Sequence, residues 1–246
     1  MLKEELGIPY PKIDTLFERD SDFNVTDVLR NPVIATINEW DVDEKVDGTN
    51  VRVMLTKNEA GEPVVRYGGR TDNAQMPTDL LKYLQDTFTL EKLLGVFGAD
   101  GSVPDVVMYG EGYGPGIQAC GGRYRKDKSF RLFDVLINGK SWLDVKTREG
   151  IASSLAIKTV PYLGRMGLEQ IVSLVREGFS SLVAAEEGDE NLEAEGIVAR
   201  PIEPLYDRRH NRLIIKLKTI DFRHEHKGSG TSQKNEAVAE AEAANN

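Results

Sequence analysis

The sequence predicts a mixed α/β (α+β) protein made of short strands and short helices. Apolar residues alternate with polar ones over short stretches such as 51–55 and 130–137, which is typical of strands with one buried face. A second pattern, at helical spacing, is clearest in Leu80, Leu81, Leu84 and Phe88. With 246 residues, of which 40% are hydrophobic and 29% charged, the chain can bury the core of one large domain or two small ones.

The first half of the chain is predicted to contain several strands and one long helix. The N-terminal 31 residues predict an irregular lead-in with a short helix. Residues 33–55 predict two strands joined by a tight turn, because apolar runs flank the Asp47–Gly48 pair. Residues 64–67 predict a short strand that ends at two glycines, and Thr78 suits the N-cap of the helix that follows.

The second half continues in the same way and ends in a tail of different composition. Strands are expected at 106–109, 130–137, 194–200 and 213–217, and helices at 141–157 and 168–175. Residues 228–246 run from Gly-Ser-Gly into Ala, Glu and Asn, a composition that cannot bury a core. We therefore expect a folded domain over residues 1–227 and a disordered or transiently helical acidic tail over residues 228–246.

Composition and charge exclude several classes of protein. No apolar run reaches the ~18 residues of a membrane span and the N-terminus has no signal-peptide core, so we expect a cytoplasmic protein without membrane contact. A single cysteine, Cys120, excludes an intramolecular disulfide framework and a cysteine-based zinc site. The net charge of -9 argues against a general nucleic-acid binder, although 121–131 and 208–227 are basic and 186–190 is acidic.

The stretch from Glu44 to Asn50 contains the first candidate functional residue, Lys45. A lysine amine with its ordinary pKa of about 10.4 is protonated at neutral pH and is not a nucleophile. In a partly desolvated site beside other cations, the amine loses its proton more readily and can attack phosphorus or carbonyl carbon. A solvated lysine in a turn is the ordinary alternative, and residues 45–48 alone do not decide between the two.

Other residues with suitable chemistry lie in or beside the predicted strands, often next to glycine. Together with Lys45 they are Asn50, Arg70, Glu111, Phe133, Glu195, Lys216 and Lys218. The cations suit a polyphosphate, the two glutamates suit a ribose hydroxyl or a divalent metal ion, and the phenylalanine suits a purine ring. The last two lysines are two residues apart, so they share one face of their strand and can neutralise charge on a phosphoryl group during its transfer.

Each of these residues also has an ordinary structural interpretation. The arginine and the glutamates could be solvated loop or surface residues, and the two lysines of the last strand could protect an edge strand from aggregation. Phe133 could belong to the core, with Phe130 as the alternative partner for a ring. The order of the whole set along the chain is more informative than any single member.

In that order the residues resemble the motifs of the covalent nucleotidyltransferase superfamily, which contains ATP-dependent ligases and messenger-RNA capping enzymes. Motif I alone is weakly specific, whereas the full ordered set is highly specific, and the resemblance covers about residues 10–225. The matching segments are 45–48 (KVDG, motif I), 110–112 (GEG, motif III), 131–135 (RLFDV, motif IIIa), 195–198 (EGIV, motif IV) and 215–218 (IKLK, motif V).

Within the superfamily the sequence most resembles RNA ligase 2, the phage-type family that also includes the kinetoplastid RNA-editing ligases. Four strings carry this narrower resemblance: GTN at 48–50, GPGIQ at 114–118, PYLGR at 161–165 and EAEG at 193–196. The family more often has histidine at the position of Asp47, but aspartate is the form found in the wider group of ligases, so the difference does not threaten catalysis.

The resemblance implies a nucleotidyltransferase (ATP-grasp-like ligase adenylation) fold of antiparallel sheets flanked by helices. Because few residues follow motif V, we expect no appended C-terminal domain. The resemblance also implies that Lys45 attacks the α-phosphorus of ATP, releases pyrophosphate and keeps AMP as a phosphoramidate. The AMP then passes to the 5′-phosphate of an RNA strand, and a 3′-hydroxyl displaces it. The expected substrate is a nicked or bridged RNA duplex, and the expected biological role is RNA repair.

The resemblance further assigns a role to each candidate residue. The implied roles are ribose binding for Glu111, adenine stacking for Phe133, phosphate or ribose contact for Arg70, Mg²⁺ binding for Glu195, α-phosphate binding for Lys216 and Lys218, and a place around the nucleotide for Glu44, Val46 and Asn50. Magnesium suits such a site because it prefers oxygen ligands and bridging phosphates. The basic run 123–131 is expected to follow an RNA backbone.

Three functions remain open at this point. An ATP-dependent RNA ligase fits best. A DNA ligase or GTP-dependent capping enzyme of the same superfamily, and a non-catalytic nucleotide- or RNA-binding relative, are the alternatives. Members of the superfamily carry a second domain after motif V, whereas about 28 residues follow Lys218 here, which leaves a place for a partner protein that replaces this domain.

Overall fold

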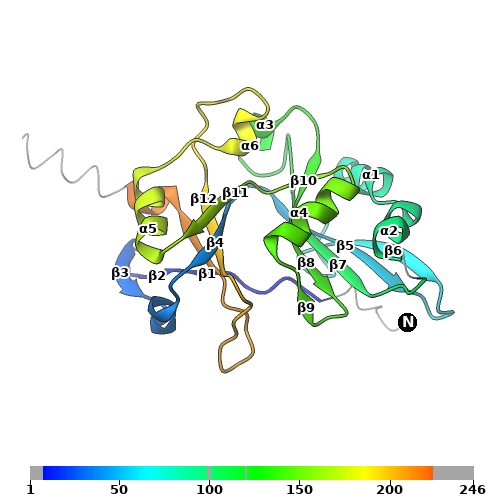
Figure 1. The fold of residues 1–246 in the computed structure, drawn as a ribbon. Coiled ribbons are helices and arrows are strands. Elements are labelled where there is room, and N and C mark those ends of the chain that lie inside the picture. Colours follow the sequence, from blue (N-terminus) through cyan, green and yellow to red (C-terminus); the bar gives the residue numbers. More distant parts are fainter. Residues whose placement is uncertain (1–7, 99–100, 120, 224–246) are drawn as a thin grey trace, which may run out of the picture.

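The computed structural model describes residues 8–98, 101–119 and 121–223, which form two sheets side by side with helices around them (Figure 1). The first sheet has the order β1 (Asp14–Thr15), β13 (Ile215–Lys218), β12 (Gly196–Pro201), β4 (Trp40–Glu44) and β11 (Tyr162–Met166). The second has the order β10 (Lys158–Thr159), β8 (Ser129–Ile137), β7 (Val106–Tyr113), β5 (Thr49–Lys57) and β6 (Pro63–Gly69), with β9 (Ser141–Trp142) paired to β8. A separate hairpin consists of β2 (Phe17–Arg19) and β3 (Val25–Leu29).

Both sheets are mainly antiparallel, and the predicted mixed α+β class with helices at the flanks is confirmed. Two short pairs are parallel, β1 with β13 and β10 with β8. Each parallel pair adds a two-residue strand to the outer edge of its sheet, so the central strands keep the antiparallel arrangement.

The core of the second sheet is shared with α1 (Thr78–Thr87), α2 (Leu90–Phe97) and α4 (Val145–Ser154). Leu80 and Leu84, which stand at helical spacing in α1, are fully buried against alternate residues of β5, among them Val51 and Val53. The apolar face of a helix, with a period of 3.6 residues, therefore packs on the apolar face of a strand, with a period of 2, in one core.

The core of the first sheet is shared with α5 (Leu168–Glu177) and with the short 3₁₀ helices η1 (Pro32–Thr36) and η2 (Thr219–Phe222). Ile171 and Val175 of α5 are fully buried in it together with Trp40 of β4. Two single helical turns, α3 (Gly121–Tyr124) and α6 (Leu182–Ala185), lie next to each other at one end of the molecule (Figure 1).

The strands on either side of Lys45 do not pair, so the predicted hairpin at Asp47–Gly48 is wrong. β4 lies between β12 and β11 in the first sheet, whereas β5 lies between β7 and β6 in the second. Residues 45–48 therefore cross from one sheet to the other. Gly48 allows the crossing, because a Cβ at this position would lie 2.5 Å from the carbonyl oxygen of Gly112. The crossing places Lys45 at the junction of two sheets rather than at the lip of one.

Other differences concern short elements and element ends. The N-terminal lead-in contains three strands within the described residues rather than a short helix, and the first helical turn in that part of the chain is η1. The predicted helix 141–157 is shorter, because Ser141–Trp142 pairs with β8 and the side chain of Asp144 caps α4. The sequence did not predict α2 or β11. Both elements are short, so they contain too few residues to show a clear apolar periodicity.

The predicted tail, residues 228–246, lies outside the described residues, as does the end of the predicted domain. The described helices include none that is long and apolar enough to cross a membrane.

Candidate active site

Lys45 lies directly after β4 and beside the start of β12. The backbone N–H of Lys45 donates to the carbonyl oxygen of Gly196 at 2.9 Å. The antiparallel register of β4 and β12 brings Lys45 next to Glu195. The Nζ of Lys45 lies 2.5 Å from Oε2 of Glu195, and the Nζ of Lys218 lies 2.7 Å from Oε1 of the same carboxylate. One carboxylate therefore binds two amines.

Gly196 allows these three side chains to meet. Its φ is +145°, and a Cβ at this position would lie 2.0 Å from the carbonyl oxygen of Leu217. Glycine is the residue type that accommodates both the positive φ and the close approach. The start of β12 is thus in close contact with β13 where Gly196 faces Lys218 in the register.

Several cations gather around this carboxylate. Lys216 and Lys218 lie on one face of β13, as predicted, since their apolar neighbours in the strand are buried in the core of the first sheet. Burial lowers the pKa of Lys216, and the positive charges of Lys45, Lys218 and Arg70 lower it further. Arg70 follows the end of β6, so both sheets contribute cations to one site.

The two lysines of β13 differ in their electrostatic surroundings. Burial acts to lower the pKa of Lys218, but its hydrogen bond to Glu195 and the negative charges of Glu195, Asp221 and Asp47 together outweigh burial and raise the pKa above its ordinary value. Lys218 is therefore held charged by the carboxylate, whereas Lys216 loses its proton more readily.

Glu111 and Asn50 lie opposite each other on β7 and β5, the strands of the second sheet nearest the crossing. Burial raises the pKa of Glu111 to about 8, with the positive charge of Lys45 opposing the shift and the charges of Glu195 and Asp47 supporting it. Glu111 is thus mainly protonated at neutral pH and can donate a hydrogen bond. The Oδ1 of Asn50 is buried and has no hydrogen-bond partner among the described residues, a position that is unfavourable by roughly 1–3 kcal/mol unless a ligand supplies a donor.

Phe133 lines a small cavity of about 80 Å³ beside Lys45. The apolar part of its lining comes from Tyr10, Ile13, Val46, Phe133, Val160 and Val198. Phe130, the alternative ring partner, lies in the core of the second sheet and packs edge to face against Phe88 with 5.2 Å between the ring centroids. The two phenylalanines are three residues apart in β8, so the alternation of the strand directs them to opposite faces.

Glu44 and Val46 flank Lys45 and line the same cavity. The carboxylate of Glu44 is buried and accepts hydrogen bonds from the hydroxyl of Ser181 at 2.5 Å and from the N–H of Leu182 at 2.9 Å. Burial raises the pKa of Glu44, and these hydrogen bonds oppose the shift. The side chain of Glu44 therefore anchors the start of α6 beside the lysine.

Sequence reasoning missed a buried network of charges next to the cavity. The carboxylate of Asp43 accepts hydrogen bonds from Arg148 at 2.7 and 2.9 Å, and Arg200 binds it as well. Burial acts to raise the pKa of Asp43, but the two arginines outweigh it and lower the pKa. Asp134 is held in the same way by Arg212 at 2.6 Å and by the hydroxyl of Tyr10 at 2.9 Å. The sequence signal was the presence of aspartates inside strands, which normally disfavour them: Asp134 stands in the largely apolar β8, and Asp43 in β4 beside two other acids.

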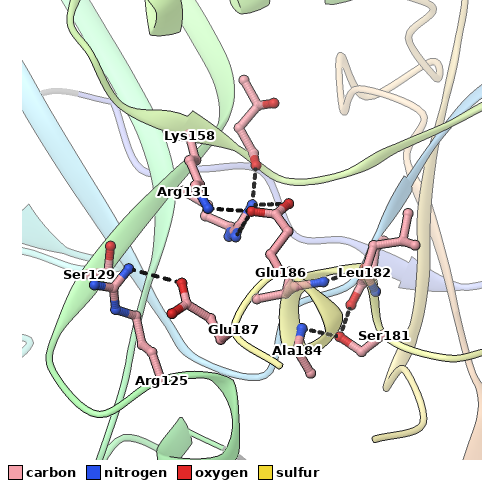
Figure 2. A network of polar contacts seen from close by, with 12 residues as sticks. Arg125, Ser129, Arg131, Lys158, Ser181, Leu182, Ala184, Glu186 and Glu187 are labelled. Carbon is pink, nitrogen blue, oxygen red and sulfur yellow. Dashed lines mark hydrogen bonds and ion pairs between the residues drawn. The ribbon is translucent and has the colours of Figure 1, made fainter. Parts of the chain in front are cut away.

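The basic run 121–131 meets the acidic run 186–190, which begins where α6 ends (Figure 2). Ion pairs join Arg131 to Glu186 at 2.9 Å, Arg125 to Glu187 at 3.3 Å and Arg123 to Asp189 at 3.0 Å. Lys158 also pairs with Glu186. The chain neutralises most of the cations of this run itself, with exposed Lys126 as the described exception, so the run offers less free cationic surface than the sequence predicted for an RNA backbone.

The site thus has a lysine at the junction of two sheets, cations around it and an apolar cavity beside it. The chain belongs to the RNA ligase family, whose model matches residues 38–218. No curated protein sequence matches the chain.

Solved structures of similar fold include several of RNA ligase from Naegleria gruberi. A mutant with ATP and Mn is 20% identical with a TM-score of 0.57, and the match covers 88% of this chain and 62% of that chain. A second mutant with ATP and Mn is 20% identical with a TM-score of 0.58, covering 89% and 64%. The protein with PPi is 18% identical with a TM-score of 0.56, again covering 89% and 64%. This chain therefore spans less than two thirds of the length of these proteins, and the likeness establishes the fold.

Proposed function

We propose that the chain is an ATP-dependent RNA ligase of the RNA ligase 2 type, which joins 3′-hydroxyl and 5′-phosphate ends. The observation that carries the proposal is the contact of Lys45 with Glu195 at 2.5 Å inside a group of cations that includes Lys216 and Lys218. A nucleophilic amine, a polyphosphate and a metal ion would all find partners in this group. Membership of the RNA ligase family supports the choice of reaction.

The residues around the cavity fit an adenine nucleotide. Phe133 and Val198 offer apolar surface to a purine, and protonated Glu111 can donate a hydrogen bond to a ribose hydroxyl. The Oδ1 of Asn50, which lacks a partner within the described chain, offers an acceptor to a donor of the nucleotide. The lysines of β13 and Arg70 supply positive charge for the phosphates.

Mg²⁺ is the metal ion that we propose for this site. The described residues contain no group of three or more His, Cys, Asp or Glu side chains that could hold a metal ion by themselves. Mg²⁺ commonly binds through one or two carboxylates together with water and substrate phosphates. Glu195 supplies such a carboxylate at the lysine site. When bound, the ion would offset negative charge on the phosphates.

In the first step, Lys45 accepts AMP. Its amine is occupied by Glu195, so the ion pair opens before the lone pair on Nζ is free to react. The neutral amine forms a bond to the α-phosphorus of ATP, the bond from that phosphorus to the bridging oxygen breaks, and pyrophosphate leaves, while the nitrogen loses a proton. Lys216 and Lys218 stabilise the charge that develops on the α-phosphate oxygens.

The next two steps consume the adduct. An oxygen of the RNA 5′-phosphate attacks the phosphorus of AMP, and Lys45 leaves as the amine with a proton. The 3′-hydroxyl of the second strand then attacks the 5′-phosphorus of the RNA, loses its proton, and expels AMP as the new phosphodiester forms. We propose nicked or bridged RNA duplexes as substrates, because such duplexes hold the two ends together.

Incubation with labelled ATP or labelled GTP, followed by a denaturing gel, tests the proposal. We expect a covalent AMP adduct that is absent in Lys45→Ala, and joining of a nicked RNA duplex by the unmodified chain. A GMP adduct without an AMP adduct would assign the chain to the capping enzymes. Joining of DNA nicks without joining of RNA nicks would assign it to the DNA ligases.

A further inference from the structure

The connection between β12 and β13 is a hairpin, residues 202–214, that projects from the first sheet at the end opposite to α3 and α6 (orange in Figure 1). Tyr206 and Arg212 form an isolated antiparallel bridge in it. The N–H of Leu213 donates to the carbonyl oxygen of Leu205 at 2.8 Å, and the N–H of Asp207 donates to that of Asn211 at 2.9 Å. The connection is therefore an ordered arm rather than an irregular loop.

The conformation of the tip is fixed by one carboxylate. Asp207 accepts hydrogen bonds from the N–H of Arg209 and the N–H of Asn211, both at 2.8 Å, and from the side-chain amide of Asn211 at 3.0 Å. His210 closes the turn with a φ of 61°. The hydrogen bond from the Asn211 side chain is the main cause of the lowered pKa of Asp207, so this carboxylate is ionised at neutral pH. Its oxygens accept the hydrogen bonds that hold the turn.

The base of the hairpin is fixed as well. Arg212 is buried, donates to Asp134 at 2.6 Å, and lies over the ring of Trp142 at 4.2 Å from its centroid. The cleft of about 770 Å³ at this base is lined by as many acidic as basic side chains. The cleft as a whole therefore has little attraction for phosphate, in contrast to the tip.

The tip carries free positive charge. Arg208 and Arg209 are exposed, and no ion pair within 4.0 Å joins either to a described residue, although the positive charge of Arg209 helps to lower the pKa of Asp207. Leu205 and Tyr206 beside them are 42% and 47% exposed. The basic run 121–131 differs in this respect, because three of its arginines pair with the acidic run 186–190. Of the described cations in 121–131 only Lys126 lacks an ion pair, whereas both arginines at the hairpin tip lack one, so the tip offers more free positive charge to a partner.

We propose that this tip, residues 205–210, binds the phosphate backbone of the RNA substrate, with Arg208 and Arg209 as the phosphate contacts and Tyr206 as a stacking surface. Cations that replace condensed counterions and aromatic side chains that stack on bases are the two general sources of sequence-independent affinity for nucleic acid. The inference rests on the proposed RNA ligase function and names the surface that holds the substrate.

The position of the hairpin sets where on the RNA this contact falls. β12 begins next to Glu195 and ends at Pro201, so its six residues separate the lysine site from the hairpin by about 20 Å. The arm extends about five residues further, which places the tip roughly 35 Å from Lys45. That distance is on the order of one helical turn of duplex, so the arm reaches only substrates with long flanks.

Binding of two nicked RNA duplexes tests the inference, one with about six and one with about twenty base pairs on each side of the nick. Arg208→Ala/Arg209→Ala is expected to bind the long duplex roughly tenfold more weakly than the unmodified chain, with a salt slope smaller by about two, and the short duplex unchanged. Arg123→Ala/Arg125→Ala, which removes the same charge from the neutralised run, is the matched control and is expected to bind both duplexes like the unmodified chain.

Formation of the AMP adduct without RNA is measured in parallel, because it reports on the fold and on the proposed function separately from RNA binding. If the unmodified chain forms no adduct, the proposed function fails. If all three proteins form it and the hairpin variant binds the long duplex as tightly as the unmodified chain, the inference is overturned. Equal weakening of both duplexes by the hairpin variant, or equal weakening by the control, overturns it too.

Discussion

Glu195 binds the amines of Lys45 and Lys218 through its two oxygens, so the charge balance of the site depends on this one residue. The phosphates of a nucleotide would compete with the carboxylate for the same amines. The site therefore combines groups of both signs within hydrogen-bond distance, an arrangement more typical of functional sites than of a stabilising surface pair.

The first prediction concerns Lys45. Lys45→Ala should abolish the covalent AMP adduct, because the amine is the group proposed to form the bond to phosphorus. It should retain some joining of RNA that already carries a 5′-adenylate, since that reaction needs no new adduct. Both are measured on gels with labelled ATP and with pre-adenylated strands. An adduct that persists in the variant would show that another residue is the nucleophile.

The second prediction concerns the partners of that amine. Glu195→Ala and Lys218→Ala should each lower the rate of adduct formation by roughly 100-fold or more, the range found when a group that stabilises transition-state charge is lost. Both side chains face the site rather than the core, so both variants should remain folded by circular dichroism. Unfolding of both would favour a structural role instead.

The third prediction concerns Glu111, whose pKa burial raises to about 8. A carboxyl whose pKa is higher in the folded than in the unfolded chain stabilises the fold at low pH, and this contribution is lost as pH rises from about 4.5 to about 8. Glu111→Gln should therefore flatten the fall in the free energy of unfolding over that interval, by an amount on the order of a few kcal/mol. Urea unfolding at a series of pH values measures it, and an unchanged pH profile would contradict the shift.

At the scale of elements, the site is made where β12 begins. The crossing at 45–48, the start of β12 and the end of β13 meet there through strand pairing, and Gly196 permits the close approach to Leu217. The carboxylate of Glu44 adds α6 to the same junction. Small changes in the backbone at this point should therefore affect the chemistry more than equal changes elsewhere.

The fourth prediction tests this junction with Gly196→Ala. The new Cβ would meet the carbonyl oxygen of Leu217 at a φ that L-residues rarely adopt, so the free energy of unfolding should fall by roughly 2 kcal/mol or more. Adduct formation should fall as Glu195 moves. Gly61→Ala is the matched control, because Gly61 also has a positive φ but a Cβ there meets nothing within 4 Å. It should lose less stability and keep its rate of adduct formation, and equal losses in both variants would count against the junction.

At the scale of the whole molecule, the charges are divided so that the lysine site and the free hairpin tip are cationic while the chain as a whole carries -9. Much of the remaining basic charge is neutralised inside the chain, at 121–131 by 186–190. RNA would therefore be held mainly through phosphate contacts at the exposed cations, and its binding should fall as the salt concentration rises.

The fifth prediction follows from this division of charge. Raising the salt concentration from about 50 to about 200 mM should change adduct formation little, because that step takes place among partly buried groups. Joining of a nicked duplex should fall by tenfold or more over the same range, as phosphate contacts weaken. Rates of both steps, measured side by side, check it. Joining that is as insensitive to salt as adduct formation would contradict it.

Alternation and helical spacing in the sequence predicted the mixed α+β class, the residue types predicted the chemistry of the site, and the order of the motifs predicted the superfamily. Several site residues could be found from the sequence because the chemistry needs a particular residue type, such as Lys45 for an amine. Others could be found because the alternation of a strand depends only on neighbouring residues. The shared face of Lys216 and Lys218 followed directly from the period of two residues and is observed.

Contacts between distant segments could not be predicted in this way, because they depend on which strands become neighbours. Only the tertiary structure decided that β4 and β5 belong to different sheets, that Phe133 rather than Phe130 lines the cavity, and that Asp43 is bound by Arg148 and Arg200. It also decided that one basic run is neutralised by an acidic run some 60 residues away, as in the Arg125–Glu187 pair. Sequence alone determined the groups available to the site, and long-range packing determined which of them remain free to act.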